Sequence, residues 1–495
     1  MKKVIIIGGG VAGLGAALKV KRAAESGLDV DFVLLEKDTR LGGKVRGEII
    51  ENEYGRFVVD GGPDSFLTAK PAVHRIAKLT GVDSHKMPTD ESRKLTLILK
   101  DGRVYPMPDG VMQFAPTKFV PFATTGLFSW PGKFRAGMDL FIPKKIVPDG
   151  ELNDETLEDF IVRRMGREIL DRLAEPLVGG VHGSDPAKMS LAATFPNLLE
   201  MEQKHGCMIK GFLAQRKMVE EMRKKYPPDP KNPKTFFTAF SGGMHEFTEA
   251  MADTAGREKL RSHASVHSLS RGEDGTWTAT LGDGSSETGD AAIIATESWA
   301  AEPLVRPLDA AIADALAEIP SSSSATVSFA FKEDEIGIDM NAFGVLCPAK
   351  ENSRLLAATY SSTKWPGRAP KGAVLLRAFV GGPQNQEVME QSDDETAEMA
   401  LAELRRILHI NPKAHPIFHR FFRWTGGMPQ YTMGHLGRVA VIEERSRSVS
   451  GLALAGGSYR GVGLPNCIES GEAAVTKVLA DCGIAYDEVE EKRAH

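Results

Sequence analysis

The chain of 495 residues has few cysteines, no CxxC spacing and no excess of either charge. Its four cysteines lie too far apart for a disulfide framework or a zinc site, and their scarcity fits a reducing cytoplasm. Lys and Arg number 61 against 66 Asp and Glu, which argues against a dedicated nucleic-acid binder. No apolar run approaches the ~18 residues that a membrane span needs. We therefore expect a cytoplasmic protein of about two to four domains, with no metal site.

The first residues carry the pattern of a nucleotide-binding strand–turn–helix unit. Residues 4–7 (VIII) predict a buried parallel strand, and an alanine-rich helix is predicted after the glycines that follow. In the turn, Gly8 permits the tight bend, Gly10 lets a pyrophosphate approach the backbone, and Gly13 lets the helix approach the strand. The N-terminus of such a helix offers free N–H groups to phosphates. This unit binds either NAD or FAD.

The next acidic residue and the loop after it separate these cofactors. Glu36 ends a predicted second strand, where a carboxylate holds both ribose hydroxyls and repels the extra phosphate of NADP. Residues 41–46 (LGGKVR) complete an E-x(5)-GG-x-x-R pattern. This pattern resembles FAD-dependent oxidoreductases of the amine-oxidase and phytoene-desaturase type. The resemblance implies that Gly42, Gly43 and Arg46 contact FAD; the alternative is a plain turn followed by a surface charge.

The far end of the chain predicts a second half of the same site. A short strand runs into a glycine turn at 451–457, and a helix is predicted over 466–479 with Pro465 at its start. A helix N-terminus stabilises the negative charge of a reduced flavin. We predict that the flavin is lined by Gly456, Gly457, Val462, Gly463 and Leu464.

Internal segments predict the remaining sheets. Residues 261–266 predict a strand on which Val266 is a candidate backbone contact to adenine. A second sheet, suited to form the floor of a substrate site, is predicted from strands at 327–331 and 374–380. The serines at 321–324 predict a turn, and residues 423–431 are expected to run back toward the flavin.

Seven further motifs are spread over the chain: residues 61–66 (GGPDSF), 106–108 (PMP), 175–182 (EPLVGGVH), 185–191 (DPAKMSL), 193–196 (ATFP), 241–244 (SGGM) and 455–465 (AGGSYRGVGLP). Together they resemble the oxygen-dependent protoporphyrinogen oxidases, a flavoprotein family that includes related coproporphyrinogen oxidases. The middle and C-terminal blocks are specific to this family, because general amine oxidases do not carry them. Gly61, Gly62 and Pro63 are cofactor contacts by this resemblance.

The resemblance also implies an α/β fold with three parts. The first is an FAD-binding Rossmann-like domain of the amine-oxidase and phytoene-desaturase type. The second is a mixed-sheet substrate domain, and the third is an inserted helical, membrane-associating domain. The bounds that we expect are 1–85, 240–298 and 435–495 for the FAD domain, 86–103, 200–239 and 299–434 for the substrate domain, and 104–199 for the helical domain.

The implied reaction is the oxidation of protoporphyrinogen IX to protoporphyrin IX in heme biosynthesis. Hydride passes to flavin N5 and then to oxygen, which gives hydrogen peroxide. Three alternatives remain open: coproporphyrinogen III as substrate, an amine or polyene oxidised on the same fold, and a non-catalytic flavin-binding partner. Aromatisation drives the oxidation, so no protein base is required and we assign no catalytic residue, although His182 is a candidate.

The substrate contacts are less well defined by the motifs. Gly179 and Gly180 are placed to let backbone approach the macrocycle, but His182 stands where the family often has Tyr. The family's propionate-binding Arg falls on Thr96 by count from Gly102. Arg93 or Lys94 is then the candidate cation, and a plain surface charge is the alternative for each.

Residues 106–150 differ from the rest in composition, with seven aromatic side chains and a local charge of +2. The aromatic residues are Phe114, Phe119, Phe122, Phe128, Trp130, Phe134 and Phe141. Aromatics interleaved with cations suit shallow insertion into an anionic lipid surface; a helical core or a dimer contact explains them equally. The resemblance implies a peripheral contact on the cytoplasmic face of the membrane, with a homodimer and hand-off to ferrochelatase as further partners.

Overall fold

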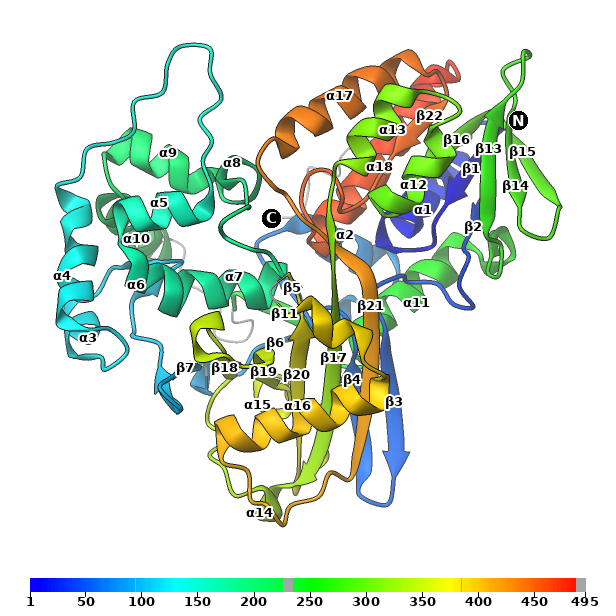
Figure 1. The fold of residues 1–495 in the computed structure, drawn as a ribbon. Coiled ribbons are helices and arrows are strands. Elements are labelled where there is room, and N and C mark those ends of the chain that lie inside the picture. The colour runs from blue at the N-terminus through cyan, green and yellow to red at the C-terminus, as the bar shows by residue number, and fades with distance from the viewer. Residues whose placement is uncertain (94, 226–234, 384, 487–495) are drawn as a thin grey trace.

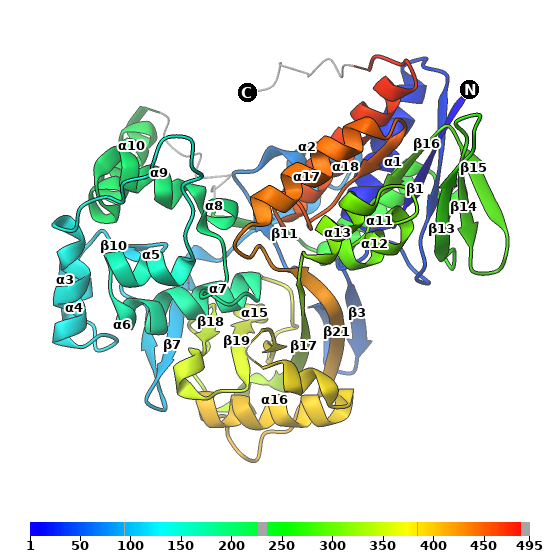
Figure 2. The same cartoon turned by 45° about the horizontal axis from the view of Figure 1, so that its top comes forward.

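The computed structural model describes the whole chain except residues 94, 226–234, 384 and 487–495 (Figure 1). The view in Figure 2 shows helices α3 to α10 gathered on one side and the N- and C-terminal segments together on the other. A large sheet that contains β17 and β19 lies below and between them.

A five-stranded parallel sheet unites both ends of the chain. Its order is β12 (Leu260–Arg261), β2 (Val30–Leu35), β1 (Lys2–Ile7), β16 (Ala291–Ile294) and β22 (Leu452–Leu454). Residues 4–7 of β1 are all buried. Because successive side chains of a strand point to opposite faces, β1 is covered on both faces of the sheet. Val4 and Ile6 join one hydrophobic cluster, while Ile5 and Ile7 join another.

Helices cover both faces of this sheet. The face of Val4 packs against α1 (Val11–Glu25), α2 (Pro71–Leu79), α11 (Met244–Ala255) and α18 (Leu464–Asp481). The face of Ile5 packs against α12 (Ser298–Val305), α13 (Ala310–Ala317), α17 (His435–Ser448) and a three-stranded sheet. The strands of that small sheet are β13 (Val266–Arg271), β14 (Trp277–Leu281) and β15 (Ser286–Gly289).

The strand predicted over 261–266 is interrupted. β12 ends at Arg261 and β13 begins at Val266. Between them, His263 has a positive φ of 55°, and its backbone N–H donates to the carbonyl of Asp38. The chain turns there because its N–H groups bind the segment after β2 instead of extending a ladder.

The second large sheet has seven strands. Their order is β21 (Phe418–Pro429), β17 (Ser321–Lys332), β20 (Ala373–Gly381), β19 (Leu355–Tyr360), β18 (Gly344–Leu346), β7 (Thr96–Lys100) and β8 (Arg103–Pro106). Helix α16 (Asp393–Leu408) covers one face. The strands predicted at 327–331 and 374–380 are confirmed within β17 and β20. The turn predicted at 321–324 is wrong, because these serines begin β17, which pairs with a strand on each side.

Shorter elements connect the two large sheets. They are the hairpin β3 (Gly47–Asn52) and β4 (Gly55–Asp60), the sheet of β5 (Phe66–Leu67), β11 (Phe237–Phe240) and β6 (Lys86–Pro88), and helix α15 (Ser361–Lys364). Helix α14 (Glu333–Ile336) follows β17 and packs in the cluster beneath α16. Phe57 and Val59 of the hairpin pack on the face of the seven-stranded sheet that α16 leaves uncovered.

The helical part follows β8. Its elements are β9 (Val111–Met112), β10 (Ala115–Pro116), α3 (Phe119–Thr124), α4 (Trp130–Gly137), α5 (Leu157–Arg164), α6 (Arg167–Ile169), α7 (Glu175–His182), α8 (Leu191–Thr194), α9 (Pro196–His205) and α10 (Met208–Lys225). Among the described residues, no helix combines the length and apolar character needed to cross a bilayer.

The aromatic residues of this part have two roles. Phe114, Phe122 and Phe128 are buried in the helical core. Phe119, Trp130, Phe134 and Phe141 are exposed, with 54% to 79% of their surface open to solvent. Phe114, Phe122 and Phe128 are therefore part of a helical core. Of the seven aromatic side chains, only the four exposed ones can contact a lipid or a partner.

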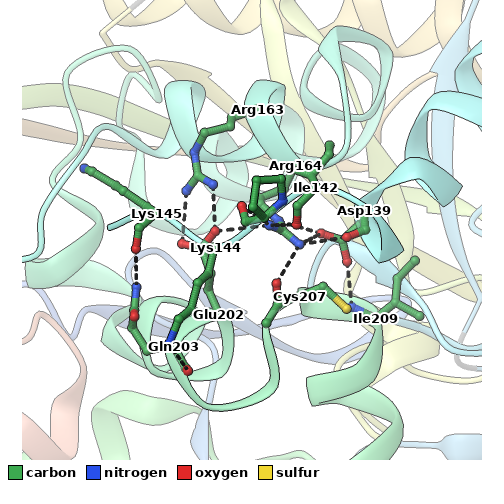
Figure 3. A network of polar contacts seen from close by, with 12 residues as sticks. Asp139, Ile142, Lys144, Lys145, Arg163, Arg164, Glu202, Gln203, Cys207 and Ile209 are labelled. Carbon is green, nitrogen blue, oxygen red and sulfur yellow. Dashed lines mark hydrogen bonds and ion pairs between the residues drawn. The ribbon is translucent and has the colours of Figure 1, made fainter. Parts of the chain in front are cut away.

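A buried ionic network holds the helical part together (Figure 3). Arg164 of α5 is fully buried and donates from Nε to the Asp139 carboxylate at 2.6 Å. Its Nη1 lies 3.2 Å from a carboxylate oxygen of Glu202, which is also fully buried. The same guanidinium donates to the carbonyls of Ile142 and Gly206. One side chain thus joins α5 to the loop after α4 and to the end of α9.

Candidate functional site

The glycine turn after β1 has the geometry that its sequence predicts. Gly8 has a φ of 107°, a conformation that side chains rarely adopt. A Cβ on Gly13 would lie 1.9 Å from the carbonyl oxygen of Gly8, so helix and strand are in direct contact there. A Cβ on Gly10 would meet nothing nearer than the Gly43 Cα at 3.9 Å. The open space above Gly10, at the start of α1, suits a pyrophosphate.

Glu36 lies at the end of β2, beside this turn, and is 8% exposed. Its carboxylate accepts from the backbone N–H of Gly9 at 2.6 Å and of Asp38 at 2.8 Å. Two oxygens with about four lone-pair sites leave acceptor capacity for ribose hydroxyls. The N–H of Ala264 donates to the Glu36 carbonyl, which brings the start of β13, and therefore Val266, close to this end of the site.

The loop of residues 41–46 packs directly on the glycine turn. A Cβ on Gly43 would lie 2.9 Å from the Gly10 Cα, and the N–H of Gly42 donates to the Gly9 carbonyl. Arg40 holds this loop, since it donates to the carbonyls of Leu41 and Gly43. Sequence reasoning missed Arg40, although its position two residues before the glycine pair was a usable signal.

The Gly61–Gly62 turn packs on the other side of that loop. A Cβ on Gly62 would lie 1.8 Å from the Lys44 carbonyl oxygen, and the N–H groups of Gly61 and Gly62 both donate to the carbonyl of Arg46. The Arg46 guanidinium lies 5.4 Å from the ring centre of Phe422. Pro63 follows in the same turn.

One carbonyl in this turn accepts hydrogen bonds from side chains on three strands of the seven-stranded sheet. Gly61 O accepts from Thr326 Oγ1 at 2.7 Å, from Arg377 at 2.9 Å and from Trp424 Nε1 at 3.1 Å. Burial lowers the pKa of Arg377, and the carboxylates of Asp64 and Asp60 oppose that shift. The sequence offered no local sign of these three donors, because they lie on β17, β20 and β21.

Asp64 balances the charge of this buried region. Burial alone would raise the pKa of Asp64, but Lys364, 3.0 Å away, and Arg377 hold the pKa well below its usual range. Asp64 therefore stays ionised, and two cations stay paired beside the Gly61–Gly62 turn.

The C-terminal glycine turn lies at the carboxyl ends of β1, β16 and β22, where open α/β sheets bind their ligands. The N–H of Gly456 donates to Ser470 Oγ, and α18 begins at Leu464 with Gly463 as its N-cap. Cys467 lies in the first turn of α18, where burial raises the pKa of its thiol to about 11. Val462 precedes this N-terminus, and α18 packs directly on α1, since a Cβ on Gly471 would lie 2.0 Å from the Ala12 carbonyl oxygen.

An ion pair joins the loop of residues 41–46 to the segment that follows β16. Lys44 of the N-terminal loop lies 3.1 Å from Glu297, which directly follows Thr296. Burial would raise the pKa of Glu297, but Lys44 lowers it below the ordinary value. A Cβ on Gly456 would lie 3.8 Å from the Thr296 carbonyl, so residues 296–297 contact both the N-terminal loop and the C-terminal turn.

Tyr431 connects this turn to the middle block. Residues 423–431, predicted to run back toward the flavin, end beside the C-terminal glycine turn, where Tyr431 Oη donates to the Gly457 carbonyl at 2.7 Å. The backbone N–H of Ser190 donates to the Tyr431 carbonyl at 2.8 Å.

The predicted substrate residues lie in separate places. Thr96 begins β7 and is in register with Gly344, Thr359 and Arg377 across four strands. Arg93 is exposed and borders a surface hollow of about 280 Å³ that also contains Glu333 and Asp339. Gly179 lies in α7 near Glu175. The surroundings of Gly180 and His182, and Lys94 itself, lie outside the described part of the chain.

Comparison with known proteins decides the family. The sequence model for "Flavin containing amine oxidoreductase" matches residues 11–479. The chain belongs to this family. A flavin-containing amine oxidoreductase carries a flavin, and the open cradle above Gly10 and the buried Glu36 fit FAD, so FAD is the cofactor of this site.

The resemblance to porphyrinogen oxidases is also confirmed. This flavin-containing amine oxidoreductase is 31% identical to a coproporphyrinogen III oxidase of Bacillus subtilis, over 97% of this chain and 98% of the relative. It is 29% identical to protoporphyrinogen oxidase 1 of Spinacia oleracea chloroplasts, over 96% of this chain and 84% of the relative. A crystal structure from Exiguobacterium sp. 255-15, provisionally named a protoporphyrinogen oxidase, superposes with a TM-score of 0.83 at 26% identity, covering 97% and 99% of the two chains.

Proposed function

We propose that this chain oxidises a porphyrinogen to the corresponding porphyrin, with FAD as its redox group and oxygen as the final acceptor. The observation that carries this proposal is the contact between the middle block and the C-terminal turn. Ser190 binds the Tyr431 carbonyl, and the Tyr431 hydroxyl binds Gly457. The block typical of porphyrinogen oxidases thus lies beside the turn predicted to line the flavin ring.

The residues of the chain have separable tasks in this mechanism. The turn at Gly10 and the α1 N-terminus hold the pyrophosphate, while Glu36 holds the ribose. A flavin held by these residues would supply the two-electron acceptor for oxidation at a bridging carbon of the porphyrinogen. Arg377 is buried and donates to the Gly61 carbonyl, and Asp64, with 17% of its side chain exposed, holds Lys364 beside this turn. Their task is to position backbone and exclude water.

The chain divides by task in the same way. We assign residues 1–85, 240–298 and 435–495 to FAD binding, and residues 86–103 and 299–434 to the substrate domain. The helical domain takes residues 104–199 together with the rest of α9 and with α10, because Met208 and Phe212 of α10 pack in the helical core and not in the substrate domain that the sequence predicts for residues 200–239. The face of the seven-stranded sheet opposite α16, with Thr96 and Arg377 in one row, is the floor of the substrate site. Arg377 is bound to the Gly61–Gly62 turn. Arg93 is thus the propionate-binding candidate that remains among the described residues.

Two porphyrinogens are candidate substrates. Protoporphyrinogen IX is the substrate that the motifs imply. Coproporphyrinogen III is favoured by relatives with that name at 30% and 31% identity, from Staphylococcus aureus and Bacillus subtilis, each of which matches 97% of this chain. The two substrates differ in the number of propionate groups, because coproporphyrinogen carries four and protoporphyrinogen two.

Anaerobic stopped-flow mixing tests the proposal. The FAD-loaded protein is mixed with each porphyrinogen, and the visible absorbance of the flavin is followed. Fast bleaching by one substrate supports the reaction and identifies the substrate, and bleaching by both supports the reaction class. Fully FAD-loaded protein that is bleached by neither would contradict the proposal.

We also propose that the helical part touches the membrane surface. Trp130 and Phe134 are 72% and 74% exposed on α4, and Lys133 lies over the Trp130 ring. Aromatic side chains with adjacent cations favour shallow insertion among anionic headgroups. Cosedimentation with anionic vesicles measures this contact.

A further inference from the structure

Tyr431 lies where three distant parts of the chain meet. Its hydroxyl donates to the Gly457 carbonyl at 2.7 Å and accepts from the Gly461 N–H at 2.6 Å. The two glycines are four residues apart, so a single oxygen closes the turn between them. Tyr431 is 6% exposed, which keeps both hydrogen bonds away from water.

The backbone around Tyr431 is bound to the middle block. The Tyr431 carbonyl accepts from the N–H of Ser190 at 2.8 Å. Met189 and Thr432 form an antiparallel bridge, and the N–H of Met433 donates to the Lys188 carbonyl at 3.0 Å. The end of β21 is therefore attached on one side to the block 188–190 and on the other to the turn 457–461.

His435 supports the ring of Tyr431 from behind. The two rings are stacked at 4.0 Å with 14° between their planes, and His435 is fully buried. His435 Nε2 lies 2.8 Å from the carbonyl oxygen of Tyr459, within the same turn. A carbonyl only accepts, so Nε2 carries the proton in this hydrogen bond. The turn is thus held at Gly457, Tyr459 and Gly461.

We propose that Tyr431 is a positioning residue for the flavin, a role that rests on the proposed FAD contacts at residues 456–457 and 462–464. Its hydroxyl sets the shape of the turn that leads into the N-terminus of α18. Its backbone links that turn to the block at 188–190, which we place beside the substrate. Without the hydroxyl, the Gly461 N–H and the Gly457 carbonyl both lose this hydrogen-bond partner, and the turn loses the contact that closes it.

A matched pair of variants tests this role. Tyr431→Phe removes one oxygen that has two backbone partners. Tyr459→Phe removes a hydroxyl oxygen from the same turn. That oxygen is buried and has no hydrogen-bond partner among the described residues. FAD affinity is measured by fluorescence quenching on titration of the apo-protein, and the visible circular dichroism of bound FAD reports its surroundings. We expect Tyr431→Phe to weaken FAD binding about tenfold and to change the dichroism, whereas Tyr459→Phe stays within about twofold of wild type.

Equal FAD affinities and unchanged dichroism in both variants would overturn the proposal. If Tyr431→Phe is not recovered as folded protein, His435→Phe replaces it. That variant keeps a ring against Tyr431 but removes the bond to the Tyr459 carbonyl. Weaker FAD binding by His435→Phe than by Tyr459→Phe then supports the proposal, and equal binding overturns it.

These measurements need no substrate, so they separate this inference from the proposed reaction. Wild-type protein that binds FAD but is not bleached by either porphyrinogen refutes the reaction alone. Wild-type protein that is bleached, together with Tyr431→Phe and Tyr459→Phe that bind FAD alike, refutes the positioning role alone.

Discussion

The carbonyl oxygen of Gly8 lies 1.9 Å from the place that a Cβ on Gly13 would take. Helix α1 therefore touches the turn after β1 through bare backbone. Gly10, between the two, faces open space instead, with its nearest neighbour at 3.9 Å. Glycines of one motif thus meet different demands: Gly13 is required for packing, and Gly10 leaves the space in which we propose the ligand binds.

This difference predicts opposite outcomes for two substitutions. Gly10→Val should leave the apo-protein folded and remove its FAD, because the added methyl groups fill the space above the turn. Gly13→Ala should fail to give folded protein, because its Cβ overlaps a carbonyl. FAD content by absorbance and the melting temperature of each apo-protein test this. A Gly10→Val protein purified with its full complement of FAD would contradict the assigned site.

The buried network of Figure 3 predicts a large loss of stability for one arginine and a smaller loss for its neighbour. Arg164→Met leaves Asp139 buried without its cation, a change that costs about 3–5 kcal/mol. Arg163→Met is the matched control, since the Arg163 side chain is 29% exposed and Glu202 keeps its contact to Arg164. Urea unfolding of both variants measures the difference, and equal losses would disprove the role of burial.

His435 predicts a loss of stability in mild acid. Burial lowers its pKa to about 4, a shift that the hydrogen bond to the Tyr459 carbonyl opposes and that Arg438 and Arg460 add to. The unfolded chain binds the proton near pH 6.5 and the folded chain only near 4. Stability is therefore complete above pH 6.5 and falls by about 3 kcal/mol as the pH drops to 4.

Comparison with His435→Gln isolates this contribution, because all carboxylates titrate alike in both proteins. We expect the wild type to lose more unfolding free energy than the variant between pH 6.5 and 4. Parallel stability curves over that range would show that His435 does not carry the effect.

The exposed aromatics of α4 predict binding to lipid. Phe134→Asp should lower cosedimentation with anionic vesicles severalfold, since it puts a carboxylate where an apolar ring would enter. Phe236→Asp is the control, because Phe236 is 71% exposed but lies outside the helical part, just before β11. Raised salt should weaken the wild-type contact. Equal binding by the two variants would argue against α4 as the contact.

Local patterns predicted the parts of the site that neighbours in sequence build. The glycine turn after β1, the acid at the end of β2 and the helix from Leu464 follow from strand, turn and helix chemistry within short windows. The strands at 327–331 and 374–380 were predictable for the same reason. The turn predicted at Ser321 was wrong because pairing with β20 and β21 overrides the low strand preference of serine.

The sequence by itself determined the cofactor, because the groups that recognise FAD lie within a few residues of one another in each motif. Only the tertiary structure decided what holds those motifs in place. Thr326, Arg377 and Trp424 meet at Gly61 O from three strands, and Tyr431 reaches Gly457 across 26 residues. Such contacts depend on strand register and on packing between distant segments. No local pattern encodes them, because the same residues in another register would face the other side of the sheet.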